Sequence, residues 1–213
     1  TGARPLFFVG LDGADWRYLD RLMEAGAMPN LSALVGEGRS GVLTTMQPPL
    51  SPLVWTSMMT GASPLEHGIL DFSRFRPGTA VKEPITSGER RVPALWDMAS
   101  GAGRTVGVFG MWATYPAEPV RGCVVSDRLF SFQHREGRPP GGVVYPGDRE
   151  AWARAALDAT VRETDLAALR AYLPELLEAD LAAADASNDA FAEPVGALRR
   201  ILIETRVYDR LAS

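Results

Sequence analysis

The chain has 213 residues, of which 46% are hydrophobic and 23% charged, a balance typical of one globular α/β domain. Its net charge of −4 argues against nucleic acid as a specific partner, because such binding requires a basic face. A single cysteine excludes a disulfide within the chain, and no apolar run approaches the roughly 18 residues that a membrane span requires. The oligomeric state stays open. The chain starts without methionine, so a cytoplasmic location and, after removal of a signal peptide, a periplasmic or secreted one are both open.

The first part of the chain alternates between strand-like and helix-like segments. The apolar run over residues 5–11 predicts a buried strand, and the helical spacing of residues 15–25 predicts a helix that Gly26 closes. Pro29 opens a second predicted helix. Residues 41–46 predict another strand.

The same alternation continues further along the chain. Residues 52–60 predict a helix that ends at Gly61, and residues 92–100 predict another. Short apolar runs over residues 105–110 and 122–126 predict two buried strands. Strands separated by helices favour βαβ units, so we expect an α/β fold with a mainly parallel sheet.

The composition changes after residue 146, where Ala, Leu, Arg, Glu and Asp dominate and Gly becomes rare. This stretch predicts three helices, over residues 148–161, 165–184 and 188–211, with Pro174 placed to kink or split the second. We therefore divide the chain into an α/β part, residues 1–146, and a helical region, residues 147–213. The helical region is interpreted as a cap, an insertion or a linker.

Asp12 is the first candidate for a chemical role, because it directly follows the first predicted strand. In open α/β sheets ligands bind beyond the carboxyl ends of the strands, where a carboxylate can hold a cation. Asp-Gly is also common in turns, and a turn residue before a helix is the alternative. From this segment alone the turn is the favoured interpretation.

Ser51 is the second candidate, because it stands directly before Pro52 at the start of a predicted helix. Serine at the N-cap and proline at the first helical position is a common helix start. The same geometry places a hydroxyl where helix amides can hold phosphoryl oxygens. Serine needs a base or a metal ion to become a good nucleophile. The two histidines, His67 and His134, are distant in sequence, so a Ser-His-Asp triad is unsupported.

Four motifs occur in order: GLDGADW, AGAMPNL, SPLVWTS and TGASPLEHGI, at residues 10–16, 25–31, 51–57 and 60–69. Together they resemble the start of the type I phosphodiesterase and nucleotide pyrophosphatase family of the alkaline phosphatase superfamily. A looser likeness continues through residues 93–97 and 114–116. The resemblance implies an alkaline-phosphatase-like mainly parallel sheet flanked by helices, followed by the helical region.

The resemblance also implies a chemistry. Ser51 lies nine residues before Thr60, the spacing that the nucleophile has in the superfamily. Asp12 and Ser51 would then ligate one of two divalent metal ions, zinc or manganese. Attack by Ser51 would give a covalent phosphoserine during hydrolysis of a small-molecule phosphodiester or phosphomonoester.

The sequence also departs from the family pattern. The downstream Asp-x-x-x-His and Asp-His-Gly elements and the late histidine, which supply the other metal ligands, are absent. We therefore expect an incomplete domain, a piece of a longer enzyme that supplies part of the site and is inactive alone. Phe72 replaces the asparagine that follows His-Gly-Ile-x-Asp in nucleotide pyrophosphatases, which weakens the case for nucleotide cleavage. His67 is interpreted as a structural turn residue. The alternatives are a phosphomutase or phosphotransferase of the same superfamily, or a non-catalytic pseudoenzyme.

Overall fold

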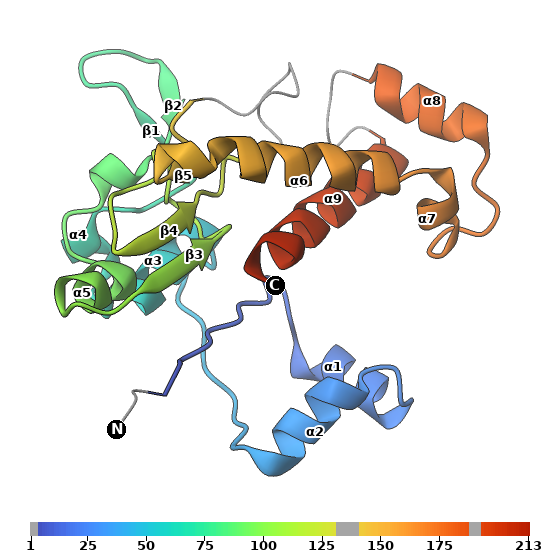
Figure 1. Ribbon diagram of the computed structural model, residues 1–213, viewed down its shortest axis with the longest axis horizontal. Coiled ribbons are helices and arrows are strands. Elements are labelled where there is room, and N and C mark those ends of the chain that lie inside the picture. The colour runs from blue at the N-terminus through green and yellow to red at the C-terminus, as the bar shows by residue number, and fades with distance from the viewer. Residues whose placement is uncertain (1–3, 131–140, 188–192) are drawn as a thin grey trace. The chain divides into compact units, whose positions relative to one another are not determined.

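The computed structural model describes residues 4–130, 141–187 and 193–213 (Figure 1). The chain divides into two compact units, an N-terminal unit, Thr1–Pro49, and a C-terminal unit, Leu50–Ser213. Across the described ranges, no helix is both long enough and apolar enough to cross a membrane.

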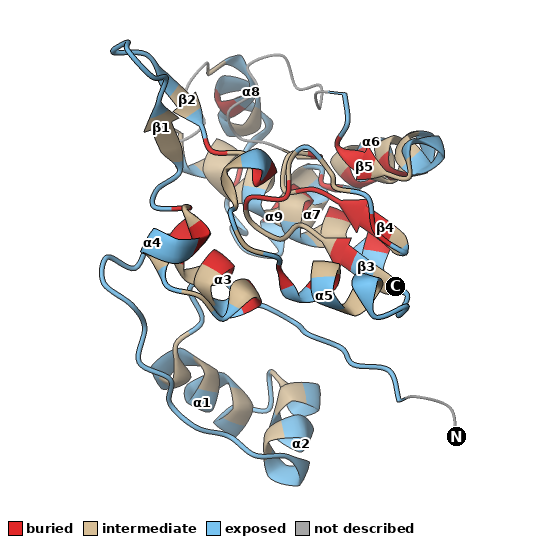
Figure 2. Cartoon of the chain, turned by 90° about the vertical axis from the view of Figure 1, so that its left-hand side faces the viewer, coloured by how far each residue is buried: buried red, intermediate tan, exposed pale blue. Residues whose placement is uncertain are grey.

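The N-terminal unit contains two helices at the predicted positions. The first, α1 (Trp16–Glu24), begins after Asp15, whose carboxylate accepts a hydrogen bond of 2.8 Å from the Arg17 amide and so caps the helix. The second, α2 (Pro29–Glu37), begins at a proline as expected. Neither helix contains a buried residue, and both are pale blue and tan in Figure 2.

The two strands predicted in this unit are not formed. Residues 5–11 and 41–46 have neither helical nor strand structure. Their apolar side chains include five that are more than 80% exposed: Leu6, Phe7, Val9, Val42 and Leu43. A strand is stabilised by pairing its amides and carbonyls with a neighbour, and no ladder among the described residues includes either segment. Both strand predictions are therefore wrong for this structure.

The C-terminal unit contains a three-stranded sheet in the order β3-β4-β5 and a separate hairpin. The sheet consists of β3 (Val106–Phe109), β4 (Gly122–Val125) and β5 (Val144–Tyr145), and the hairpin of β1 (Ser73–Phe75) and β2 (Lys82–Pro84). The predictions of β3 and β4 are confirmed, and these two strands pair in parallel with Val106 opposite Gly122. The other two pairings are antiparallel. The fold is therefore mixed α/β, and the described strands do not confirm a mainly parallel sheet.

The C-terminal unit also contains seven helices among its described residues. They are α3 (Ser51–Thr60), α4 (Pro64–His67), α5 (Leu95–Gly101), α6 (Glu150–Glu163), α7 (Leu166–Arg170), α8 (Glu178–Ala186) and α9 (Pro194–Ala212), with single 3-10 turns at Ser87–Glu89 and Gly147–Arg149. The second helix predicted in the C-terminal region is split into α7 and α8, and Pro174 lies between them as expected. The third begins at Pro194, while residues 188–192 of the prediction lie outside the described residues.

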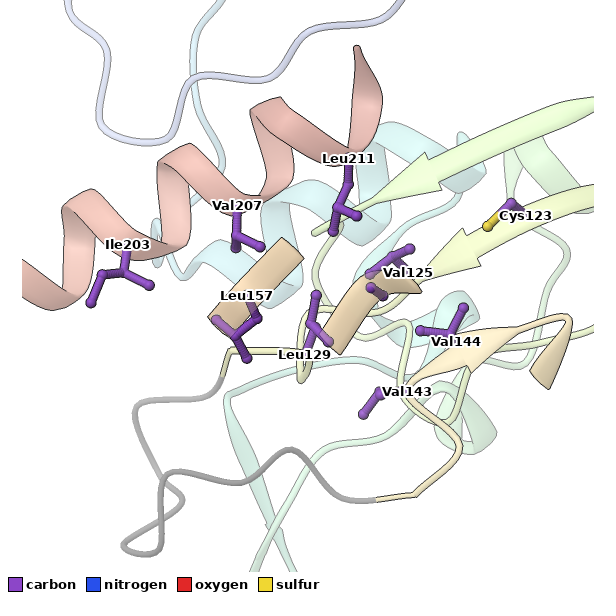
Figure 3. Close-up of a cluster of buried hydrophobic side chains, with 10 residues drawn as sticks. Cys123, Val125, Leu129, Val143, Val144, Leu157, Ile203, Val207 and Leu211 are labelled. Carbon is purple, nitrogen blue, oxygen red and sulfur yellow. The ribbon is translucent and has the colours of Figure 1, made fainter. Parts of the chain in front are cut away.

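The main core joins the sheet to the C-terminal helices. Val125 of β4, Leu157 of α6 and Val207 of α9 belong to one cluster of buried apolar side chains, which also contains Cys123 and Leu129 (Figure 3). Burial of each large aliphatic side chain contributes about 1.5–3 kcal/mol to the free energy of folding. Helices α6 and α9 therefore share the core of β4, and the proposed boundary at residue 146 stays a prediction.

Candidate active site

Ser51 is the first residue of α3, and Leu50, with extended backbone angles, occupies the N-cap. The helix thus begins one residue earlier than predicted and places Ser51 inside its first turn. Pro52 is tolerated there because first-turn amides have no partner within the helix. Gly61 ends the helix in the left-handed conformation, at φ +67°, as the sequence indicated. The Ser51 hydroxyl therefore lies at the positive end of a helix dipole.

Ser57, in the middle of α3, is hydrogen-bonded to a fully buried histidine. His67, the last residue of α4, is 0% exposed, and its Nε2 lies 2.8 Å from the Ser57 hydroxyl. Its Nδ1 lies 3.1 Å from the amide nitrogen of Ile69. The Ser57 hydroxyl is also 2.9 Å from the carbonyl oxygen of Leu53, one turn back in α3.

The directions of these hydrogen bonds follow from the partners. A backbone amide only donates, so Nδ1 of His67 is the acceptor and the imidazole proton is on Nε2. Nε2 therefore donates to Ser57, which donates its own proton to Leu53. Burial lowers the pKa of His67, since it disfavours the imidazolium. Ser57 and His67 consequently do not form a nucleophile and base pair, because the nitrogen facing the hydroxyl already carries a proton.

A second feature lies where the parallel strands end. The carboxyl ends of β3 and β4 meet at one edge of the sheet, and Asp127 follows β4 there. Its carboxylate accepts hydrogen bonds from the amides of Ala113, at 3.2 Å, and Thr114, at 3.3 Å, in the loop after β3. Ala113 has φ +57°, a left-handed conformation that costs a non-glycine residue about 1–2 kcal/mol.

Burial raises the pKa of Asp127, although the charge of Arg128 and the hydrogen bonds from Ala113 and Thr114 oppose the shift. Sequence reasoning missed Asp127. The available signal was an acidic residue directly after a predicted strand, which is the same signal that singled out Asp12.

Phe72 has an aromatic partner. Its ring contacts Trp112, in the loop after β3, with centroids 5.3 Å apart and planes at 82°, the edge-to-face arrangement that aromatic pairs prefer. Phe72, which stands where nucleotide pyrophosphatases have asparagine, is therefore packed against the loop after β3. Asp127 is hydrogen-bonded to the same loop.

Asp12 lies in the N-terminal unit, in a turn. The Ala14 amide is 3.5 Å from the Leu11 carbonyl oxygen, and Gly13 between them has φ +69°. Asp12 therefore lies in a turn, as its alternative interpretation expected, although Asp15 and not Asp12 caps the helix that follows. The strand expected before Asp12 is not formed. Ser51 belongs to the C-terminal unit, so the pairing of Asp12 and Ser51 stays a prediction.

Comparison with known proteins decides the family. The model of the type I phosphodiesterase / nucleotide pyrophosphatase family matches residues 6–191. The chain belongs to this family. Searches of curated proteins and of solved structures returned no match. The matched range includes the positions of Asp12, Ser51, His67 and Asp127. The match confirms the family resemblance that the four motifs indicated.

Members of this phosphodiesterase family are typically hydrolases of phosphodiester and pyrophosphate bonds and generally depend on divalent metals. A zinc site requires three or four protein ligands. Within the part of the chain that the structure describes, no three His, Cys, Asp or Glu side chains gather as such a site would need. Asp12 and Ser51 alone are too few, so the described residues do not fit a complete zinc site.

Proposed function

We propose that this chain supplies the nucleophile for hydrolysis of a small-molecule phosphodiester or phosphomonoester, with Ser51 forming a covalent phosphoserine. The observation that carries the proposal is the position of Ser51 in the first turn of α3, in a chain that belongs to a phosphodiesterase family. The positive end of the helix favours the anionic phosphoryl group that Ser51 would attack.

The proposed reaction has two steps. The Ser51 oxygen forms a bond to phosphorus while the bond from phosphorus to the leaving oxygen breaks, and the hydroxyl proton ends on the leaving alcohol. Water then hydrolyses the phosphoserine, which releases phosphate or a phosphomonoester and restores the hydroxyl. His67 does not accept the proton of the Ser51 hydroxyl. Its Nε2 donates to Ser57 and its Nδ1 already accepts from the Ile69 amide.

The family resemblance implies two divalent cations, zinc or manganese. Asp12 and Ser51 are proposed as ligands of one of them. Such an ion would lower the pKa of the serine hydroxyl and stabilise developing charge. Since no group of three His, Cys, Asp or Glu side chains that could hold a metal occurs among the described residues, neither step of the reaction is assigned to the metal.

Labelling tests the nucleophile even if turnover is slow. The chain would be incubated with bis-p-nitrophenyl phosphate and Zn²⁺ or Mn²⁺, and peptide mass spectrometry would locate the phosphoryl group. We expect an adduct on Ser51. Because the chain supplies only part of the site, we expect any release of p-nitrophenol to be slow, and Ser51→Ala to lower it at least about 100-fold, as loss of an essential nucleophile does. Release that is unchanged in Ser51→Ala would refute the assignment. Comparison with p-nitrophenyl phosphate separates diesterase from monoesterase activity.

A non-catalytic binding role is the second candidate, and the lack of a metal-ligand cluster among the described residues favours it. In that case neither the chain nor Ser51→Ala would release p-nitrophenol above the background of buffer and metal.

A further inference from the structure

We propose that His67 is a positioning residue for Ser51, which it orients through the hydroxyl of Ser57. This inference rests on the proposed function, in which Ser51 is the nucleophile. His67 touches no reacting group in this account. It acts by fixing the helix that presents Ser51.

The hydrogen bonds run from His67 into the first turn of α3. Nε2 of His67 donates to Ser57, and Ser57 donates to the carbonyl oxygen of Leu53, two residues after Ser51. Ser57 itself lies about 9 Å along the helix axis from Ser51, at 1.5 Å per residue. The Ser57 hydroxyl thereby connects a buried imidazole to the turn that holds the nucleophile.

The backbone that carries the imidazole is also held in place. The carbonyl of His67 accepts a hydrogen bond of 3.0 Å from the amide of Arg91. Gly68 follows with φ +82°, and a Cβ at that position would lie 2.9 Å from the carbonyl oxygen of Glu89. The backbone around His67 is therefore closely packed. A fixed imidazole gives α3 a rigid point of attachment.

The same histidine links α3 to the edge of the sheet where β3 and β4 end. The amide of Ile69 donates to Nδ1 of His67, and the fully buried side chain of Ile69 packs with Ile85 and Ala113. Ala113 in turn donates to Asp127. A continuous set of contacts thus runs from the helix of Ser51 to the loop after β3.

Positioning matters because attack on phosphorus requires the reacting atoms to be about 3–3.5 Å apart and aligned. A displacement of about 1 Å can cost on the order of 100-fold in rate. Loss of the His67 link should therefore lower the saturating rate of the Ser51 reaction and change substrate binding much less.

The test compares Ser57→Ala and His67→Asn with Thr60→Ala. Asparagine retains an acceptor for the Ile69 amide and loses the donor to Ser57. Thr60 makes the same kind of bond on the same helix, to the carbonyl oxygen of Thr56 at 2.7 Å, and its hydroxyl otherwise accepts from the amide of Ala62 at 3.2 Å rather than from His67. We expect Ser57→Ala and His67→Asn each to lower kcat for p-nitrophenol release about tenfold or more, with KM changed by less than about threefold. The double variant should lose no more than either single variant, and Thr60→Ala should keep its kcat.

A kcat within about twofold of the unaltered chain in Ser57→Ala, or an equal loss in Thr60→Ala, would overturn the proposal. A second measurement is independent of activity. The amide of Val54 donates to the carbonyl of Leu50 at 2.9 Å and so closes the turn around Ser51. Its hydrogen exchange should accelerate in Ser57→Ala and His67→Asn but not in Thr60→Ala. If the unaltered chain neither forms an adduct on Ser51 nor releases p-nitrophenol, the proposed function fails, and Val54 exchange alone then decides whether His67 fixes this turn.

Discussion

The hydroxyl of Tyr208 donates a hydrogen bond of 2.8 Å to the backbone carbonyl of Ser126 and so attaches α9 to the carboxyl end of β4. Burial raises the pKa of Tyr208 well above its ordinary value, and the charges of Asp127 and Glu204 act in the same direction. The phenol is therefore a neutral donor. The last helix thus supports the same edge of the sheet at which Asp127 holds the loop after β3.

Tyr208→Phe should destabilise the C-terminal unit by about 1 kcal/mol. The substitution keeps the aromatic ring and removes the donor, which leaves the Ser126 carbonyl with one hydrogen bond fewer. Urea unfolding measures the change. Tyr172→Phe is the matched control, since Tyr172 is 55% exposed and should change the stability by less than about 0.5 kcal/mol. Equal effects from the two variants would contradict the role of this bond.

Gly110→Ala should be more damaging, because two costs combine. Gly110 has φ +65°, and a Cβ there would lie 2.7 Å from the ring of Tyr208. Gly78 has a similar φ of +74° with no atom within 4 Å of the added Cβ. Gly78→Ala should therefore cost about 1 kcal/mol from the backbone alone. Gly110→Ala should cost about 2–4 kcal/mol, since overpacking adds about 1–3 kcal/mol. Equal unfolding midpoints for the two variants would show that the Tyr208 ring moves aside without a loss of stability.

Local signals predicted the elements whose causes lie within a few residues. The start of α3 follows from Ser51 and Pro52, and its end follows from the left-handed Gly61. Short apolar runs predicted β3 and β4, whose residues are partly or fully buried apart from the exposed Gly107. Residues 5–11 carry a similar run, but a strand forms only with a pairing partner, and sequence alone does not supply one.

The site was less predictable, because its contacts join distant positions. His67 was expected to be structural, but its partner Ser57 lies ten residues earlier, in another helix, and the sequence does not show that the two meet. Asp127 carried a local signal, since it directly follows a predicted strand, but its hydrogen bond from Ala113 involves a left-handed conformation that no local pattern favours for alanine.

The free energy of unfolding of the unaltered chain, compared with that of Asp127→Asn, should increase as the pH falls. The folded-state pKa of Asp127 lies above the ordinary value of 3.8, so the folded chain binds more protons than the unfolded chain between those two values. Stability that depends on this group therefore rises as the pH falls from the folded pKa toward 3.8. Urea unfolding of both proteins between pH 7 and pH 4 measures the difference. A difference that is independent of pH would contradict the raised pKa.

The contribution of His67 to the free energy of unfolding should instead decrease as the pH falls. The pKa of His67 is lowered from the ordinary value of 6.5, so the unfolded chain binds more protons than the folded chain below that pH. The His67 contribution is fully present above pH 6.5 and is lost as the pH falls toward the folded pKa. Subtracting the pH dependence of His67→Asn isolates this contribution. NMR titration of the His67 ring should also give a pKa below 6.5, and a higher value would contradict the buried neutral imidazole.

Zinc should bind the isolated chain weakly. Two candidate ligands, Asp12 and Ser51, fall short of the three or four that hold zinc in proteins, and no cluster of three ligand side chains occurs among the described residues. We expect elemental analysis after dialysis against metal-free buffer to find far less than one zinc per chain. Asp12→Ala should not change that amount. Stoichiometric zinc that survives dialysis and is lost in Asp12→Ala would show that Asp12 has further partners in this chain.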